Sequence, residues 1–194
     1  PNLVRYLFAF FLYNDAIHTV TAFTSIYAVV SLGFSMKEVT LLFIVAQVTA
    51  FLGAFSFGPL VDRIGGIRTI RITLVIWCLV VVGAYFIETK PPFVALVLLA
   101  GFGMGSNQGS SRGLMGKFTP PGRNAEFFGF FALCGKFSAV IGPWLFGWIS
   151  AATGSQRLAI LSLLSFFLGG LFLLSLVDEG RGVQEAREQA RTGE

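Results

Sequence analysis

Three polar side chains interrupt the first apolar stretch of the sequence within a single helical turn: Asn14, Asp15 and His18. Residues three apart lie on one face of an α-helix, so Asp15 and His18 are expected to face the same way. Lys136 lies inside a later apolar stretch. A carboxylate, an imidazole and an ammonium group can together form an ion pair, hold a charged solute or pass a proton between them.

We expect Asp15 to pair with Lys136. A rise of about 1.5 Å per residue puts Asp15 roughly 15 Å and Lys136 roughly 20 Å from the basic ends of their helices. A lone charge at that depth in a membrane costs at least about 2.5–3.5 kcal/mol, so each needs a partner or a cavity. Three interpretations stay open: a static ion pair, a binding site for a zwitterionic or anionic substrate, and a proton relay between Asp15 and His18. For His18, a hydrogen-bonded packing role competes with proton transfer.

Other polar side chains within the apolar stretches are few. Gln47 is suited either to binding a substrate or to bonding one helix to another. A polar cluster closes the fourth stretch, and its members are Asn107, Gln108, Ser110, Ser111 and Arg112. We expect Arg112 to act at a cytoplasmic gate, together with Glu126.

The elements that position these residues are predicted to be membrane-spanning helices. Of the 194 residues, 55% are hydrophobic and only 12% are charged, which leaves too little polar surface to cover a water-soluble globule. The apolar residues run continuously for about 20 positions or more, the length that a helix needs to cross a bilayer. We therefore predict an all-α membrane protein with six spans, at 6–32, 39–61, 69–88, 92–112, 125–151 and 157–177. The polar tail, 178–194, is expected to be solvated and partly disordered.

The distribution of lysine and arginine predicts the orientation of the spans. Ten basic residues fall on one side of the membrane and three on the other, with Lys136 inside a span. Because cytoplasmic loops carry the excess of positive charge, both termini are expected in the cytoplasm, in a bacterial inner (plasma) membrane. The net charge is +4, but the basic residues lie at the ends of the spans rather than in one patch. This distribution favours the lipid bilayer over nucleic acid as their partner.

Glycine and proline mark close packing and bending on two of the predicted helices. The fourth carries Gly101, Gly103 and Gly105, and the fifth carries Gly135, Gly142 and Gly147. Small residues let helix backbones approach closely in membranes. Pro143, which follows Gly142, is expected to kink the fifth helix, since proline removes one helical hydrogen bond.

The link between the second and third spans has the composition of a gate. It carries Gly58, Asp62, Arg63, Gly65 and Arg68. A glycine there allows a helix end to pack closely, the aspartate can face a helix N-terminus, and the arginines can pair with acids on a facing surface. A loop that only followed the positive-inside rule would need the arginines but not the glycine and aspartate.

This link resembles the loop signature of the major facilitator superfamily, although Ile67 stands where a basic residue is common. A closer resemblance is to the C-terminal half of the vacuole-effluxer-like family. It rests on FLYNDAIHTV at 11–20, on the stretch from QGSSRGLMGKF to GPWLFG at 108–147, and on TGSQRLAILSLL at 153–164.

The resemblance implies one six-helix half of a major-facilitator fold, with the first and fifth helices lining a central cavity. It implies a secondary transporter of a small polar metabolite, amino acids being the named class, that works by alternating access. Proton coupling through Asp15 and His18 stays one of the open interpretations of those residues. Asp62 would meet the start of the fifth helix of the opposite half. That half is either the N-terminal part of the same protein or a second copy, and Pro1 in place of an initiator methionine favours the former.

Other function classes fit the sequence less well. An intramembrane hydrolase would need a serine and a histidine at one depth, but Ser106 and Ser110 lie near one surface and His18 lies in the middle. A channel would need a loop that could form a selectivity filter, and the sequence has no such loop. A six-helix scaffold would give the charged residues no purpose beyond pairing. We expect no enzyme activity, no metal and no cofactor, and the cysteines, Cys78 and Cys134, indicate no disulfide.

Overall fold

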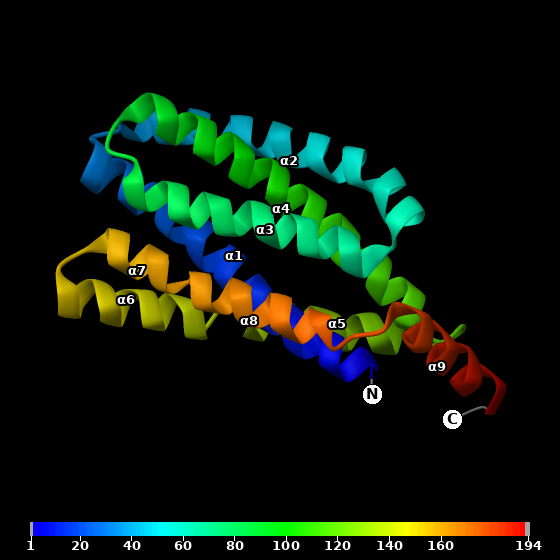
Figure 1. The fold of residues 1–194 in the computed structure, drawn as a ribbon. Coiled ribbons are helices and arrows are strands. Elements are labelled where there is room, and N and C mark those ends of the chain that lie inside the picture. Colours follow the sequence, from blue (N-terminus) through cyan, green and yellow to red (C-terminus); the bar gives the residue numbers. More distant parts are fainter. Residues whose placement is uncertain (1, 193–194) are drawn as a thin grey trace.

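The computed structural model describes residues 2–192, and this range is helical, without strands. Its helices are α1 (Asn2–Leu32), α2 (Met36–Ile64), α3 (Gly66–Phe86), α4 (Lys90–Phe118), α5 (Asn124–Phe137), α6 (Ile141–Thr153), α7 (Gln156–Ser162), α8 (Leu164–Ser175) and α9 (Glu179–Thr192). Figure 1 shows them as an elongated bundle in which both described ends of the chain lie at the same end. The predicted all-α membrane fold is confirmed.

Local chemistry explains where several helices begin. The hydroxyl of Ser35 accepts from the backbone of Glu38 while the Glu38 carboxylate accepts from the backbone of Ser35, which together cap the start of α2. The chain turns from α2 into α3 through Gly65 alone, whose φ of 91° favours glycine. Two prolines in the first turn of α4 occupy positions where a backbone N–H would have no helical partner.

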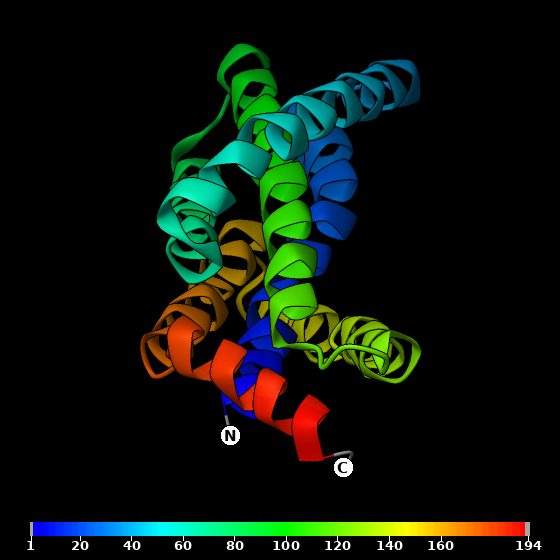
Figure 2. The same ribbon diagram turned by 90° about the vertical axis from the view of Figure 1, so that its right-hand side faces the viewer.

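Helix α4 packs closely against α2 and also against α3 (Figure 2). At Gly101 a Cβ atom would collide with Thr49 and the Ala46 carbonyl, and at Gly105 with the Ala50 carbonyl. The expectation of close packing is therefore confirmed for these two glycines. It is wrong for Gly147, around which a Cβ atom would meet nothing within 4 Å.

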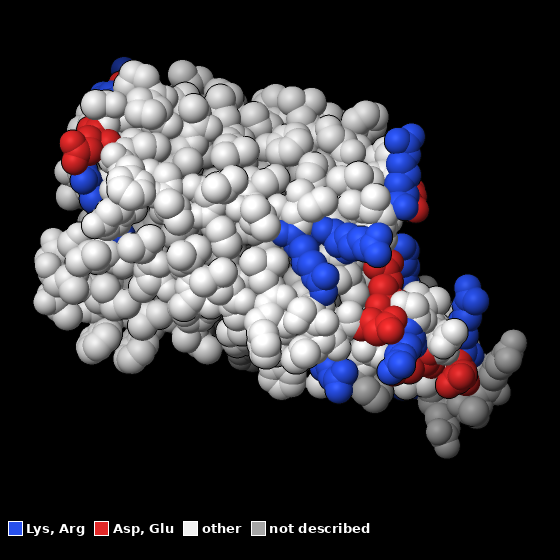
Figure 3. Space-filling model, in the orientation of Figure 1, with Lys and Arg blue, Asp and Glu red and all other residues white. Residues whose placement is uncertain are grey.

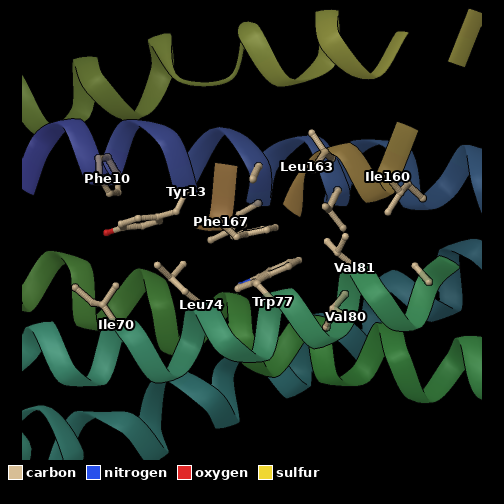
Figure 4. Packing of buried hydrophobic residues seen from close by; sticks show 14 of the residues in the cluster. Phe10, Tyr13, Ile70, Leu74, Trp77, Val80, Val81, Ile160, Leu163 and Phe167 are labelled. Atoms are coloured by element: carbon tan, nitrogen blue, oxygen red, sulfur yellow. The ribbon is translucent and has the colours of Figure 1, made fainter. Parts of the chain in front are cut away.

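Aromatic and aliphatic residues together fill the core between α1, α3, α7 and α8 (Figure 4). Trp77 and Phe167 stack with ring centroids 5.8 Å apart. Two hydrogen bonds between buried polar groups cross this region: the Tyr6 hydroxyl donates to the Ser111 carbonyl over 2.7 Å, and the Asn107 amide donates to the Thr73 hydroxyl over 2.8 Å. These bonds join helices that the apolar packing brings together.

The chain is a multi-pass membrane protein. Five segments of the described range are long and apolar enough to span a bilayer, namely Asn2–Leu32, Met36–Ile64, Gly66–Phe86, Asn124–Thr153 and Gln156–Ser175. The remaining predicted span falls on α4, which has 29 residues and ends in the polar cluster that contains Asn107 and Arg112. Charged side chains gather at the two ends of the face in Figure 3, with a broad uncharged surface between them.

Three details differ from the sequence prediction. The sixth predicted span is divided at Leu163 into α7 and α8. The fifth span is not one helix: it is interrupted between Phe137 and Ile141, just before the predicted kink, and Pro143 falls in the first turn of α6. The tail is not disordered up to residue 192, because it forms α9. That helix packs on the bundle with Ala186 buried and Val183 against the core, a spacing of three residues that makes a narrow apolar stripe.

Candidate functional site

A cavity of about 740 Å³ opens between α1, α4 and α5. Its residues are Phe10, Asn14, His18, Gln108, Arg112, Phe128, Phe131, Ala132, Gly135, Lys136 and Ala139. Three of the five predicted substrate-path residues, Asn14, His18 and Lys136, therefore lie together. The predicted lining by the first and fifth helices matches this arrangement, and α4 adds a third wall.

Asn14 fastens the first helix to the fifth. Its side-chain amide donates to the Ser138 hydroxyl over 2.7 Å and to the Gly135 carbonyl over 3.3 Å. Ser138 is the first residue of the interruption between α5 and α6, and its hydroxyl in turn donates to the Gly135 carbonyl. One wall of the cavity is thus fixed at the point where the helix stops.

The expected pairing of Asp15 with Lys136 is wrong. Asp15 is fully buried, and its Oδ2 accepts the backbone N–H of Gly142 over 2.7 Å. The break between α5 and α6 explains why Asp15 binds this N–H group. The first N–H groups of α6 have no helical partner and carry partial positive charge. Lys136 lies exposed in the cavity, and it forms no ion pair within the part of the chain that the structure describes.

The second oxygen of Asp15, Oδ1, is buried without a hydrogen-bond partner. The Thr19 hydroxyl beside it donates instead to the Asp15 backbone carbonyl, over 2.7 Å. A Cβ atom on Gly142 would collide with the Thr19 hydroxyl and lie 2.8 Å from this Oδ1. Glycine is therefore the residue that lets α6 approach the carboxylate.

Gln47 does not belong to this cavity. It lines a separate hollow of about 70 Å³, beside Thr21, Thr24 and Trp77. The helices that carry Gln47 and Lys136 lie on different sides of α1 and α4, so one small solute would not contact both in this conformation (Figure 2).

Arg112 differs from the prediction in its partner. It lines the cavity one turn from Gln108, while its expected partner Glu126 pairs with Arg123 at 2.9 Å. Arg123 and Glu126 are three residues apart on the helix start, which lets them meet without any third element. The predicted pairing of Arg112 with Glu126 is therefore wrong, and Arg112 lines the same cavity as Lys136 and His18. Its role at a gate stays a prediction.

The proposed gate residues lie at the α2–α3 turn. Gly58, Asp62, Arg63 and Arg68 are exposed, and Asp62 has no hydrogen bond or ion pair within residues 2–192. This is the arrangement expected if the Asp62 partner belongs to another segment or chain.

A residue that sequence reasoning missed, Glu179, joins α9 to this turn. Its Oε2 accepts the N–H of Ile67 over 3.0 Å and its Oε1 pairs with Lys117 over 3.0 Å. Burial alone raises the pKa of Glu179, but the N–H groups of Ile67 and Gly66 and the Lys117 ammonium group hold it below its usual value. The sequence feature that could have identified Glu179 is its position as an acid directly after the last span, where a carboxylate can reach a helix N-terminus.

Comparison with known proteins gives consistent relatives over nearly the whole chain. The family described as vacuole effluxer Atg22 like matches residues 1–187. An uncharacterised MFS-type transporter of Bacillus subtilis, YxiO, is 31% identical over 187 residues, which cover 96% of this chain and 44% of the relative. Autophagy-related protein 22 of Coccidioides immitis is 28% identical over 205 residues, which cover 97% of this chain and 34% of the relative. The chain spans less than half the length of these curated relatives.

Proposed function

Because the chain belongs to the vacuole effluxer Atg22 like family, we propose that it forms half of a secondary transporter that moves a small polar metabolite by alternating access. The family consists of transporters rather than enzymes, so the hydrolase alternative is dropped. The observation that carries the proposal is the cavity, whose polar groups from α1, α4 and α5 face a space inside a membrane protein. Such groups are costly in a bilayer unless they line a solute path.

The mate of this half is proposed to be the N-terminal part of the same transporter, with a second copy of the chain as the alternative. Two halves related by an axis along the membrane normal would enclose the cavity between them. The unpartnered Asp62 supports a mate, since its carboxylate would then face the start of a helix on the other half. Crosslinking of the purified chain would distinguish a homodimer from a single half.

Proton coupling is proposed to involve Asp15 and His18, which lie in different surroundings. The Asp15 carboxylate holds the start of α6, so its protonation would weaken the attraction between α1 and the N–H groups of that helix. His18 lines the cavity and would exchange protons with it. Amino acids are the proposed cargo class.

The proposed orientation has both termini in the cytoplasm, in a bacterial inner membrane. The described ends of the chain lie at the same end of the bundle in Figure 1, as an even number of crossings requires. The excess of arginine and lysine at that end supports the cytoplasm as its side.

Transport measurements on the complete natural protein, reconstituted in vesicles with radiolabelled amino acids, test this function. We expect Asp15→Asn, Lys136→Ala and the double variant each to lower uptake or efflux at least tenfold. Glu88→Gln and Lys37→Met, which change exposed residues at the opposite end, serve as controls and should transport normally. Wild-type rates in all three test variants would overturn the site, and no flux from the unaltered protein would favour a scaffold.

A further inference from the structure

The cavity between α1, α4 and α5 is lined by cationic groups without an acid. Arg112, Lys136 and His18 contribute to its wall, and neither aspartate nor glutamate does. The acid nearest in sequence, Asp15, is buried behind this wall with its Oδ2 on the Gly142 N–H. A solute in the cavity would therefore meet positively charged hydrogen-bond donors with no carboxylate competing for them.

The two strongest of these donors are unused. The guanidinium of Arg112 and the ammonium of Lys136 form no hydrogen bond or ion pair with the described part of the chain. Some bases elsewhere are paired, as Lys90 is with Glu38 at 2.9 Å and Arg157 with Glu88 at 2.9 Å. Those pairs lie at the end of the bundle, whereas Arg112 and Lys136 face a cavity that has room for a ligand.

The cations stand at two depths. Arg112 is six residues before the end of α4 at Phe118, whereas Lys136 is twelve residues after the start of α5 at Asn124. At about 1.5 Å of rise per residue, these positions are roughly 9 Å and 18 Å from the same end of the bundle. An anionic group that moved along the cavity would pass from one cation to the other.

An aromatic wall completes the site. Phe10 and Phe131 stack with ring centroids 4.2 Å apart, and Phe128 meets Phe131 edge to face at 6.3 Å. All three rings line the cavity. They offer apolar surface beside the charged donors, which suits a ligand with an anionic group and an apolar body.

We propose that this cavity binds an organic anion, with its charged group on Lys136 and Arg112 and its apolar part on the phenylalanine rings. The proposal rests on the transport function above and narrows its substrate class. A guanidinium group binds carboxylate or phosphate with two parallel hydrogen bonds, and the Gln108 amide one turn away can donate a further one. His18 adds a positive charge when it is protonated.

Binding to the complete natural protein in detergent, measured by calorimetry, tests the ligand class with three probes. Phenylacetate carries both the anionic group and an apolar body, phenylacetamide has the same shape without the charge, and inorganic phosphate has the charge without the body. We expect phenylacetate to bind at least tenfold more tightly than phenylacetamide, and more tightly than phosphate. Equal affinity for phenylacetate and the amide would overturn the proposal. Phosphate as the tightest ligand would show a phosphate site instead and would also overturn it.

Variants then test the residues. Lys136→Met and Arg112→Gln are each expected to weaken phenylacetate binding at least tenfold, while Lys37→Met, an exposed lysine away from the cavity, should not. Lys136→Arg keeps the charge and should retain binding, which separates lost recognition from a misfolded protein. Unchanged affinity in both Lys136→Met and Arg112→Gln would refute the assignment.

A transport assay separates this inference from the function on which it rests. Phenylacetate binding that depends on Lys136, without flux of any solute, would leave the site in place and defeat the transport function. Flux of neutral solutes that is unaffected by Lys136→Met and Arg112→Gln would support the transport function and refute the organic-anion site.

Discussion

At the scale of single residues, a carboxylate inside the bundle binds a backbone N–H group where the sequence suggested a side-chain partner. Asp15 is bound by a backbone N–H across a helix interface rather than by a lysine side chain. Backbone donors are already held in place by the helix, whereas a long lysine side chain loses rotamer freedom when it pairs. Glu179 likewise accepts a backbone N–H, from Ile67 at the start of α3, and it also pairs with Lys117.

The contact between Gly142 and Asp15 gives a prediction at this scale. Gly142→Ala would place a methyl group against the Thr19 hydroxyl and 2.8 Å from Asp15 Oδ1, so α1 and α6 must separate. Overpacking of this kind typically costs about 1–3 kcal/mol. We expect a lower free energy of unfolding, measured in mixed micelles by circular dichroism. Gly147→Ala is the matched control, because nothing lies within 4 Å of its added methyl group. Equal stabilities of the two variants would contradict the role given to Gly142.

At the scale of elements, two features that the sequence did not predict stabilise the bundle: the break between α5 and α6, and helix α9. The break at residues 138–140 ends α5 just beyond Lys136 and starts α6 at the Asp15 carboxylate. Helix α9 packs at the end of the bundle where the described ends of the chain lie (Figure 1). Glu179 joins it to α3 and α4, and the Asn2 side chain donates to Glu185 over 2.9 Å.

The docking of α9 is predicted to depend on pH. The pKa of Glu179 is lower in the folded protein than its usual value, so the ionised carboxylate stabilises the docked helix above the unfolded pKa of about 4.3. That contribution is lost as the pH falls through the lower folded pKa. We expect limited proteolysis of α9 to accelerate several-fold between pH 7 and pH 3.

Glu179→Gln should cleave quickly already at pH 7 and respond little to acid. Glu88→Gln, at the opposite end of the bundle, should keep the wild-type profile. A steep response to acid that survives in Glu179→Gln would assign the effect to another group.

Sequence was sufficient for some of these elements and insufficient for others, for physical reasons. Continuous apolar runs required helices because backbone groups in lipid must bond internally, and this predicted the bundle. The lining of a cavity by the first and fifth helices was implied by the family resemblance alone. The break at Ser138 has no signal of its own, since the residues around it are as apolar as those of a continuous span. The pairing of Arg112 with Glu126 was wrong because Arg123, three residues before Glu126, meets that carboxylate without any third element. Glu179 was missed because a polar tail looks solvated unless its partner is known.

At the scale of the whole molecule, the exposed Asp62 gives a test of the proposed second half. In the complete transporter, Asp62→Asn is expected to change the ratio of inward-facing to outward-facing states at least several-fold, because the neutral amide attracts a helix N-terminus more weakly. Distances between spin labels on the two halves measure that ratio. Asp178→Asn, an exposed acid near the same surface, is the control. An unaltered ratio in Asp62→Asn would remove the gate hypothesis.

The open cavity also bears on how such a half behaves before it meets its mate. Arg112 and Lys136 would then face lipid or a water defect, and each charge in a bilayer interior carries a penalty of about 2.5–3.5 kcal/mol. Joining the second half would remove that penalty by enclosing both groups in a shared aqueous path. The residues proposed to hold the solute would thus also drive assembly, and a variant that neutralises them should leave more of the halves unassociated.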